Sequence, residues 1–230
     1  MPVRVAFLMA GGNLHARMLL QALAAASLLP GLIVDETGTP RAEKLSRWLE
    51  NDILFVPPLS ELLAGSATRY ESVDAFDGPR SQALLRDFAP DYVISGGVGI
   101  IRQDLLDLPR IGFLNIHPGL LPEYRGVDPV LWALSEGGSL GATLHLMSAD
   151  IDKGPILIRR VLSAQPLRRS VLGWRLACMG HGAVLLGEFL RDPSFYPPLR
   201  QDEARARYFR AFPVERMAEL ESIAATRSVE

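Results

Sequence analysis

Two polar side chains, Asn115 and His117, stand two residues apart where an apolar run gives way to a loop rich in Gly and Pro. The run, residues 112–116, has the length of a buried strand, and alternate residues of a strand point to the same face. An amide and a titratable imidazole are therefore expected to face the same space. Parallel α/β sheets carry their chemistry just beyond the carboxyl ends of their strands, so this position is a candidate active site.

A carboxylate at Asp150 or Asp152 completes the set of polar candidates. Histidine gains or loses a proton near neutral pH, and a nearby carboxylate favours the protonated ring. An amide N–H and an imidazolium aimed at one point would stabilise an oxyanion, as acyl transfer requires. No nucleophile of the protein accompanies them, because Cys178 lies within an apolar helical pattern that is typical of a buried structural thiol.

Composition limits the class of protein. The chain has 230 residues, 48% hydrophobic and 22% charged, which is enough for one substantial globular core. A net charge of -2 gives no electrostatic reason to expect nucleic acid as a partner, although it leaves a local basic patch open. The single cysteine allows no intrachain disulfide or cysteine metal cluster and suits a reducing cytoplasm. The first apolar run, residues 3–10, is too short for a signal-peptide core or a membrane span, so we expect no membrane partner.

Elements that would position these residues alternate along the chain, which indicates an α/β fold. The short apolar runs predict strands at 3–10, 31–34, 53–56, 92–94, 112–116, 141–148 and 156–161. The helical patterns lie at 14–25, 41–50, 59–63, 82–88, 129–136 and 170–190, with Ser170 as an N-cap. Past residue 190 the chain is rich in Pro, then charged, then weakly helical around 214–225. We expect one domain, residues 1–190, with a C-terminal extension, residues 191–230.

Two glycine-rich turns follow apolar strands. Gly11, Gly12 and Asn13 come after the first one, where glycines let backbone N–H groups approach an anion or substrate at a helix N-terminus. The third glycine of the dinucleotide fingerprint is absent, so plain turn chemistry is an equal alternative. The second turn, residues 95–101, contains three glycines between apolar residues. We interpret it as an ordered apolar cleft wall, with a flexible connector as the alternative.

Three motifs in order resemble the folate-dependent formyltransferases: residues 115–126, 141–145 and 152–156. This family includes glycinamide ribonucleotide transformylase, methionyl-tRNA formyltransferase and the sugar-nucleotide N-formyltransferases. The similarity is dense from residue 92 to residue 158 and weaker before it. It implies a Rossmann-like α/β domain, with a mostly parallel central sheet and helices on both faces, plus the short C-terminal extension.

The resemblance implies a catalytic set of Asn115, His117 and Asp152 and 10-formyltetrahydrofolate as co-substrate, with no metal. An acceptor amine attacks the formyl carbon directly, so no protein nucleophile is needed. Asn115 and protonated His117 would hold the oxygen of the tetrahedral intermediate, each such donor being worth about 3 kcal/mol. Asp152 would keep His117 charged and order a water that relays a proton. His145 would steady the loop of Asp152, while Asp150 would cap its turn.

The same resemblance implies that the pteridine of the folate is bound largely through backbone groups before the catalytic strand. By position these groups belong to Val98, Gly99, Ile100 and Ile101. A site that reads ring edges with backbone atoms needs no particular side chains, which suits small and apolar residues.

The acceptor is inferred from departures from the family's patterns. The first turn, residues 11–14, is shorter than in the purine enzymes, and Gly180 stands where they present an acidic residue. Methionyl-tRNA formyltransferases add a C-terminal barrel domain, which residues 191–230 are too few to form. The stretch 124–132 leans towards sugar-nucleotide members. We therefore expect a small-molecule amine acceptor (an amino sugar, a nucleotide-linked amine or a specialised-metabolite precursor) and no nucleic acid, and leave a homodimer open.

Two alternatives to amine formylation remain at this point. The same catalytic set could pass the formyl group to water, which would make the chain a 10-formyltetrahydrofolate hydrolase. The chain could also be a folate-binding protein without transferase activity, although an idle site has no need of all three polar residues. The charged run 201–210 could be a solvated face or a dimer contact, and charge runs favour the solvated face.

Overall fold

The structure is a computed structural model that describes residues 3–40 and 57–229. The chain divides into two compact units, Met1–Asn115 and Ile116–Glu230, here called unit 1 and unit 2. The helix expected at 41–50 and the strand expected at 53–56 lie outside the described residues.

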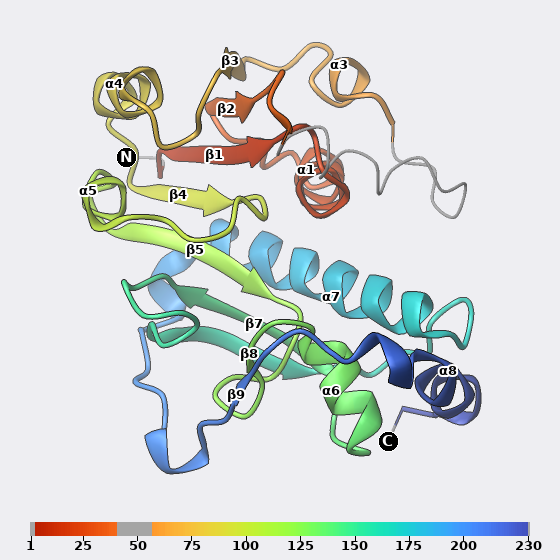
Figure 1. Ribbon diagram of the computed structural model, residues 1–230. Helices are drawn as coiled ribbons and strands as arrows, with labels where there is room; N and C mark the ends of the chain where they lie inside the picture. The colour runs from red at the N-terminus through yellow and green to blue at the C-terminus, as the bar shows by residue number, and fades with distance from the viewer. Residues whose placement is uncertain (1–2, 41–56, 230) are drawn as a thin grey trace. The chain divides into compact units, whose positions relative to one another are not determined.

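Five parallel strands form the sheet of unit 1 (Figure 1). β1 (Val5–Ala10) lies in the middle, between β2 (Leu32–Glu36) and β4 (Tyr92–Ser95). β3 (Arg69–Val73) pairs with β2, and β5 (Gly112–His117) pairs with β4. The inner strands begin with apolar runs because both of their faces are buried. β3 was not expected from the sequence, since its residues are polar and mostly exposed.

Residues at the N-termini of the helices of unit 1 explain where these helices begin. They are α1 (Leu14–Ala25), α3 (Leu59–Leu62), α4 (Pro79–Phe88) and α5 (Gln103–Leu106). Asn13 caps α1 by accepting the N–H of Ala16 at 3.0 Å, as N-cap residues do. Pro79 occupies the first turn of α4, where its missing N–H costs no hydrogen bond, so the helix begins earlier than expected.

In unit 2, β7 (Gly141–Leu146) and β8 (Ile156–Val161) pair in antiparallel fashion. The strand order is β3-β2-β1-β4-β5-β7-β8. The expected mostly parallel central sheet with helices is confirmed. The long helix α7 (Val171–Arg191) packs along β7 and begins at Ser170, whose hydroxyl accepts the N–H of Gly173 at 3.1 Å, so the expected cap is confirmed. In the part of the chain that the structure describes, no helix is long and apolar enough to cross a membrane.

Residues past 190 pack back onto unit 2. α8 (Met217–Thr226) contacts both α7 and α6 (Pro129–Ser135) (Figure 1). Two short strands, β6 (Arg125–Gly126) and β9 (Tyr208–Phe209), pair in parallel, and three short 3₁₀ helices lie at Pro193–Phe195, Glu203–Arg205 and Val214–Arg216. Leu220 and Ala224 of α8 belong to the same buried cluster as Trp174 of α7, whose indole N–H donates to the Ala224 carbonyl at 3.0 Å. The C-terminal extension is thus part of the core of unit 2.

This packing predicts the effect of shortening an apolar side chain in α8. Leu220 is 1% exposed and Val214, just before the helix, is 81% exposed. We expect Leu220→Ala to lower the free energy of unfolding by about 2–5 kcal/mol, because the lost methyl groups leave a cavity. Val214→Ala serves as the control and should leave it nearly unchanged. Urea denaturation followed by circular dichroism measures both, and equal effects of the two substitutions would show that α8 is not part of the core.

Candidate active site

Asp152 lies in the turn between β7 and β8 with its carboxylate directed inward. Its φ of 55° is in the left-handed region that residues other than Gly seldom adopt. The Oδ2 atom accepts the backbone N–H of Gly126 at 2.7 Å, and only 9% of the side chain is exposed. Gly154 completes the turn, since a Cβ there would collide with the Leu146 carbonyl oxygen. The chain therefore holds a buried carboxylate in a strained and defined conformation.

His117, at the end of β5, faces this carboxylate. Its Nε2 lies 2.6 Å from the Tyr124 carbonyl oxygen, so this nitrogen carries a proton and donates it. Its Nδ1 lies 3.7 Å from Asp152 Oδ2, which is too long for a good hydrogen bond but close enough for attraction between charges. Nδ1 is consequently the ring nitrogen that can serve a substrate atom.

His145, in β7, lies on the other side of Asp152. Its Nε2 is 3.8 Å from Asp152 Oδ1, and its Nδ1 donates to the Leu146 carbonyl at 2.9 Å. The His145 and His117 rings meet edge to face with centroids 6.5 Å apart. Burial, and then the charge of His117, lower the pKa of His145 to about 4, although Asp152 acts in the opposite sense. At neutral pH the His145 ring is neutral.

A threonine that the sequence interpretation did not single out fixes the loop after β5. The Thr143 hydroxyl donates to the Gly119 carbonyl at 2.7 Å and accepts the Leu121 N–H at 3.1 Å. Thr143 and His145 are separated by one residue in β7, whose register shifts between Leu144 and His145. The alternation of that strand was the signal in the sequence that could have indicated its role.

Asn115, the remaining member of the expected catalytic set, lies in β5 two residues before His117. It is half-buried and pairs in register with Ser95 of β4. The structure thus brings His117, His145 and Asp152 together within unit 2. Asn115 belongs to unit 1, so its part in catalysis stays a prediction.

The loop expected to hold the pteridine, residues 98–101, follows β4 in unit 1. Val98 and Ile101 are buried, whereas Gly99 is exposed and Ile100 is 73% exposed. Within the described part of the chain, the backbone N–H and C=O groups of these four residues form no hydrogen bonds. Unpaired backbone donors and acceptors beside an exposed apolar side chain fit the edge and face of a heterocyclic ring.

The first glycine turn is largely occupied by the protein's own contacts. The Asn13 side chain caps α1 and donates to the Gly96 carbonyl at 2.8 Å. Gly11 donates its N–H to the Glu36 carbonyl at 2.8 Å, and Gly11 and Gly12 have positive φ angles. Their role in substrate binding stays a prediction, while the turn role is visible.

Two other candidate residues, Asp150 and Cys178, lie in surroundings that do not favour a catalytic role. The Asp150 side chain is 70% exposed and pairs with Lys153 at 3.3 Å, so it does not reach His117. Cys178 is fully buried, and burial raises the pKa of its thiol to about 12, which leaves it unreactive at neutral pH. Among residues 3–40 and 57–229, no group of three or more His, Cys, Asp or Glu side chains could hold a metal ion.

Comparison with known proteins identifies the family. Residues 3–171 match the family model for formyl transferase. This chain belongs to the formyl transferase family. It is 36% identical over 159 residues to methionyl-tRNA formyltransferase of Dehalococcoides mccartyi, covering 68% of this chain and 51% of that protein. It is 37% identical over 126 residues to the enzyme of the same name from Deinococcus radiodurans, covering 54% and 39%. The chain spans about half the length, or less, of these curated relatives.

Solved structures of the family share the fold. A glycinamide ribonucleotide transformylase from Symbiobacterium toebii superposes with a TM-score of 0.61 at 18% identity, covering 87% of this chain and 95% of that one. A 4-N formyltransferase from Francisella tularensis gives 0.65 at 15% identity, covering 97% and 87%. The expected Rossmann-like formyltransferase fold is confirmed.

The comparisons overturn the expected partners. A small-molecule amine acceptor and no nucleic acid were expected, but the curated relatives at 35–36% identity over 159 residues are named for a tRNA acceptor. The expectation rested on the net charge, the short first turn, Gly180, the stretch 124–132 and the number of residues after 190. None of these features identifies the acceptor that the matched residues serve.

The lowered pKa of His145 predicts how stability depends on pH. The unfolded chain binds a proton at His145 below about pH 6.5, whereas the folded protein does so only near pH 4. Stability should therefore fall as pH falls between these two values. We expect His145→Gln to flatten this slope in thermal unfolding scans, although not to abolish it, because burial also lowers the pKa of His181. An unchanged slope would contradict the neutral state assigned to His145.

Proposed function

We propose that this chain transfers the formyl group of 10-formyltetrahydrofolate to the amine of an aminoacyl-tRNA, with methionyl-tRNA as the acceptor. The acceptor is supported by the name shared by its curated relatives and by 36% identity over 159 residues to one of them. The observation that carries formyl transfer is the buried Asp152 carboxylate flanked by the His117 and His145 imidazoles, in a chain of this family.

The donor is expected at the loop 98–101 of unit 1. Its free backbone groups and the exposed Ile100 side chain support binding of a flat, polar-edged ring. When bound, 10-formyltetrahydrofolate supplies a formyl carbonyl as the electrophile. Because the acceptor amine attacks that carbon directly, the inert state of Cys178 is consistent with the reaction.

His117 and Asp152 handle charge and protons in this proposal. The His117 Nε2 is held by the Tyr124 carbonyl, so its Nδ1 donates to the negative charge that develops on the formyl oxygen. Asp152, at 3.7 Å, stabilises the positive charge on the ring and accepts the proton that the amine loses, directly or through a water. The same proton passes to the folate nitrogen as the bond between that nitrogen and the formyl carbon breaks, so tetrahydrofolate is the leaving group. The family resemblance gives Asn115 as the expected second donor. The neutral His145 adds no competing positive charge beside Asp152.

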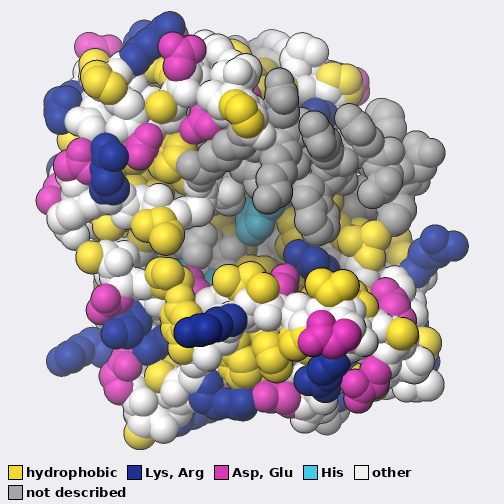
Figure 2. Space-filling model, viewed as in Figure 1, with side chains coloured by type: hydrophobic (Ala, Val, Ile, Leu, Met, Phe, Trp, Pro, Cys, Tyr) yellow, Lys and Arg dark blue, Asp and Glu magenta, His cyan; other side chains and the backbone are white. Residues whose placement is uncertain are grey.

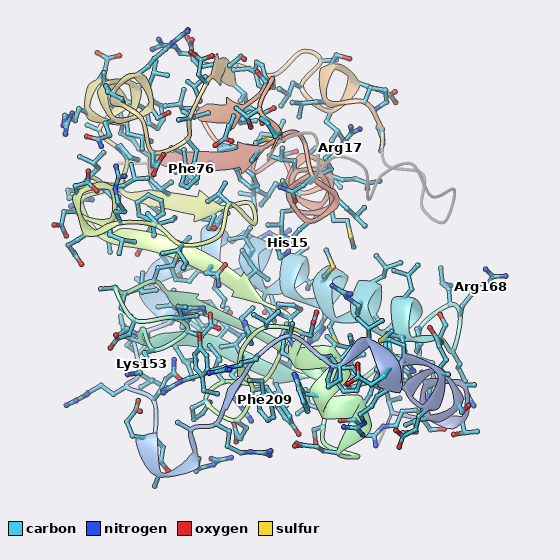
Figure 3. The ribbon with its side chains drawn as sticks, viewed as in Figure 1. His15, Arg17, Phe76, Lys153, Arg168 and Phe209 are labelled. Atoms are coloured by element: carbon cyan, nitrogen blue, oxygen red, sulfur yellow. The ribbon has the colours of Figure 1, made fainter. Side chains whose placement is uncertain are left out.

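The acceptor needs a surface for its phosphates, and the loop before α7 offers one. Figure 2 shows Lys and Arg side chains interspersed with Asp and Glu on the visible face of unit 2. Arg168 and Arg169 are adjacent and both exposed, and neither has an ion pair or hydrogen-bonded side-chain partner among the described residues. Arg168 points away from the ribbon (Figure 3). Guanidinium groups of this kind bind phosphates of the nucleic acid backbone.

The catalytic assignment predicts a contrast between two aspartates of one turn. We expect Asp152→Asn and His117→Ala each to lower the rate of formyl-methionyl-tRNA synthesis about 100-fold or more, since each removes charge beside the reacting atoms. Asp150→Asn, in the same turn but exposed, should retain nearly the full rate. The assay measures formylated methionyl-tRNA with 10-formyltetrahydrofolate as donor. Full activity of Asp152→Asn would remove the mechanism.

The same assay distinguishes the acceptor from water. Wild-type protein should form formyl-methionyl-tRNA and release little formate in the absence of tRNA. A hydrolase would instead release formate from 10-formyltetrahydrofolate at a rate that methionyl-tRNA does not change, and it would form no formylated product. That result would contradict the proposed acceptor.

Substitutions in the loop of Arg168 and Arg169 should weaken tRNA binding without slowing the chemical step. We expect Arg168→Gln combined with Arg169→Gln to raise the KM for methionyl-tRNA about threefold or more and to leave kcat unchanged, because phosphate contacts act on association. Arg191→Gln, an exposed arginine at the other end of α7, is the matched control. Measuring KM at several salt concentrations should show a shallower salt dependence for the double variant. Equal KM values for all three proteins would rule the loop out.

A further inference from the structure

Gln201, thirty residues beyond the end of the family match at residue 171, contacts the turn of Asp152. Its side-chain N–H₂ group donates to the backbone carbonyls of Asp152 and Gly154, both at 2.7 Å. Its side-chain oxygen accepts two hydrogen bonds from Arg125, at 3.1 and 2.8 Å. One amide thus joins the catalytic turn to Arg125 and uses both its donors and its acceptor in doing so.

Arg125 is the second part of this arrangement. It is 3% exposed and forms a two-pronged pair with Glu203, at 3.0 and 2.7 Å. A buried guanidinium is costly unless all its charge is paired, so Gln201 and Glu203 together fix its position. The next residue, Gly126, donates its N–H to the Asp152 carboxylate. The segment that holds Arg125 therefore also orients the side chain of Asp152.

The backbone of residues 201–212, which we call the clamp segment, runs beside β6. Arg125 donates to the Arg207 carbonyl and Val127 to the Phe209 carbonyl, each at 3.0 Å. The Phe209 ring, labelled in Figure 3, stacks on Tyr124 with centroids 5.6 Å apart. A side chain at Gly126 would collide with the Phe209 carbonyl, so the close approach requires glycine. The clamp segment therefore determines where the Gly126 N–H points.

The contacts of Gln201 stabilise an unfavourable backbone conformation at Asp152. A residue other than Gly in the left-handed region persists only where its surroundings over-determine it. Gln201 binds the carbonyl of Asp152 itself and the carbonyl two residues later, one on each side of Lys153. Most side chains of the run 201–210 are exposed, as its charge predicted, but the partly buried Gln201 serves the turn.

We propose that Gln201 is a positioning residue for formyl transfer, which holds Asp152 in the conformation that faces His117. The inference rests on the proposed function for its activity readout. Gln201 is not needed to attach the C-terminal residues, because Phe212 and Leu220 anchor them in the core of unit 2. Loss of its two donor bonds should therefore loosen the turn and leave the fold intact.

The test compares Gln201→Glu with Gln201→Met and with Arg205→Gln. Gln201→Glu keeps an oxygen that accepts from Arg125, but it places a carboxylate next to the carbonyl oxygens of Asp152 and Gly154, which repel it. Gln201→Met has a side chain of similar volume and removes all four hydrogen bonds of Gln201. Arg205→Gln removes an exposed ion pair with Glu123 from the same segment and is the matched control. Each protein is assayed for kcat and KM with methionyl-tRNA, for the pH dependence of kcat, for melting temperature, and for hydrogen exchange of residues 150–156.

We expect both Gln201 variants to lose on the order of 10- to 100-fold in kcat, because small displacements of a catalytic group cost that much. Their KM values and melting temperatures should stay near those of the wild type, the pH profile of kcat should shift, and exchange of residues 150–156 should be faster. Arg205→Gln should match the wild type in every measurement. Wild-type kcat in both Gln201 variants, or an equal loss in Arg205→Gln, overturns the proposal.

Hydrogen exchange separates this proposal from the proposed function. If the wild type formylates no methionyl-tRNA, the proposed acceptor fails, while faster exchange of residues 150–156 in the Gln201 variants alone still supports the clamp. Unchanged exchange in those variants refutes the clamp whatever the acceptor is.

Discussion

The burial of one carboxylate, that of Asp152, is the constraint on which the rest of unit 2 depends. A charge removed from water is tolerated only where hydrogen bonds and opposite charge replace its hydration. Gly126 gives it an N–H, and His117 and His145 flank it at 3.7 and 3.8 Å. The turn that carries it needs glycine at position 154 and accepts a left-handed residue at position 152. The demands of a single charge thus explain several residues that otherwise look unrelated.

The two histidines beside that carboxylate have different tasks because their surroundings differ. His145 is held on a backbone carbonyl and is kept neutral by burial, so it fills space without adding charge. His117 is held by its Nε2 alone, which leaves Nδ1 next to the carboxylate. A polar network in a buried site specifies one arrangement only when its members are satisfied. Here much of that satisfaction comes from backbone groups of the loop after β5 and from Gln201 of the clamp segment.

The acceptor shows how one part of an inference from sequence can be overturned while another part is confirmed. The three short motifs indicated the formyl transferase family, to which the chain belongs. The expected acceptor was drawn from other features: the number of residues past 190, the net charge and departures from the family's patterns. Relatives matched over 159 residues are named for a tRNA acceptor, and an overall charge of -2 does not exclude a local cationic loop such as Arg168 and Arg169.

The sequence by itself determined the features whose signals are local: apolar runs in the inner strands, the cap at Ser170, and the separate motifs that contain His117 and Asp152. It did not reveal β3, because an exposed edge strand has no apolar face to show. Only the tertiary structure decided that the Tyr124 carbonyl holds His117 and that Gln201 binds the Asp152 turn 49 residues away. The physical reason is that every residue type carries the same backbone carbonyl, and every type except proline the same backbone N–H. Contacts made by those groups across the chain leave no trace in residue types or their spacing.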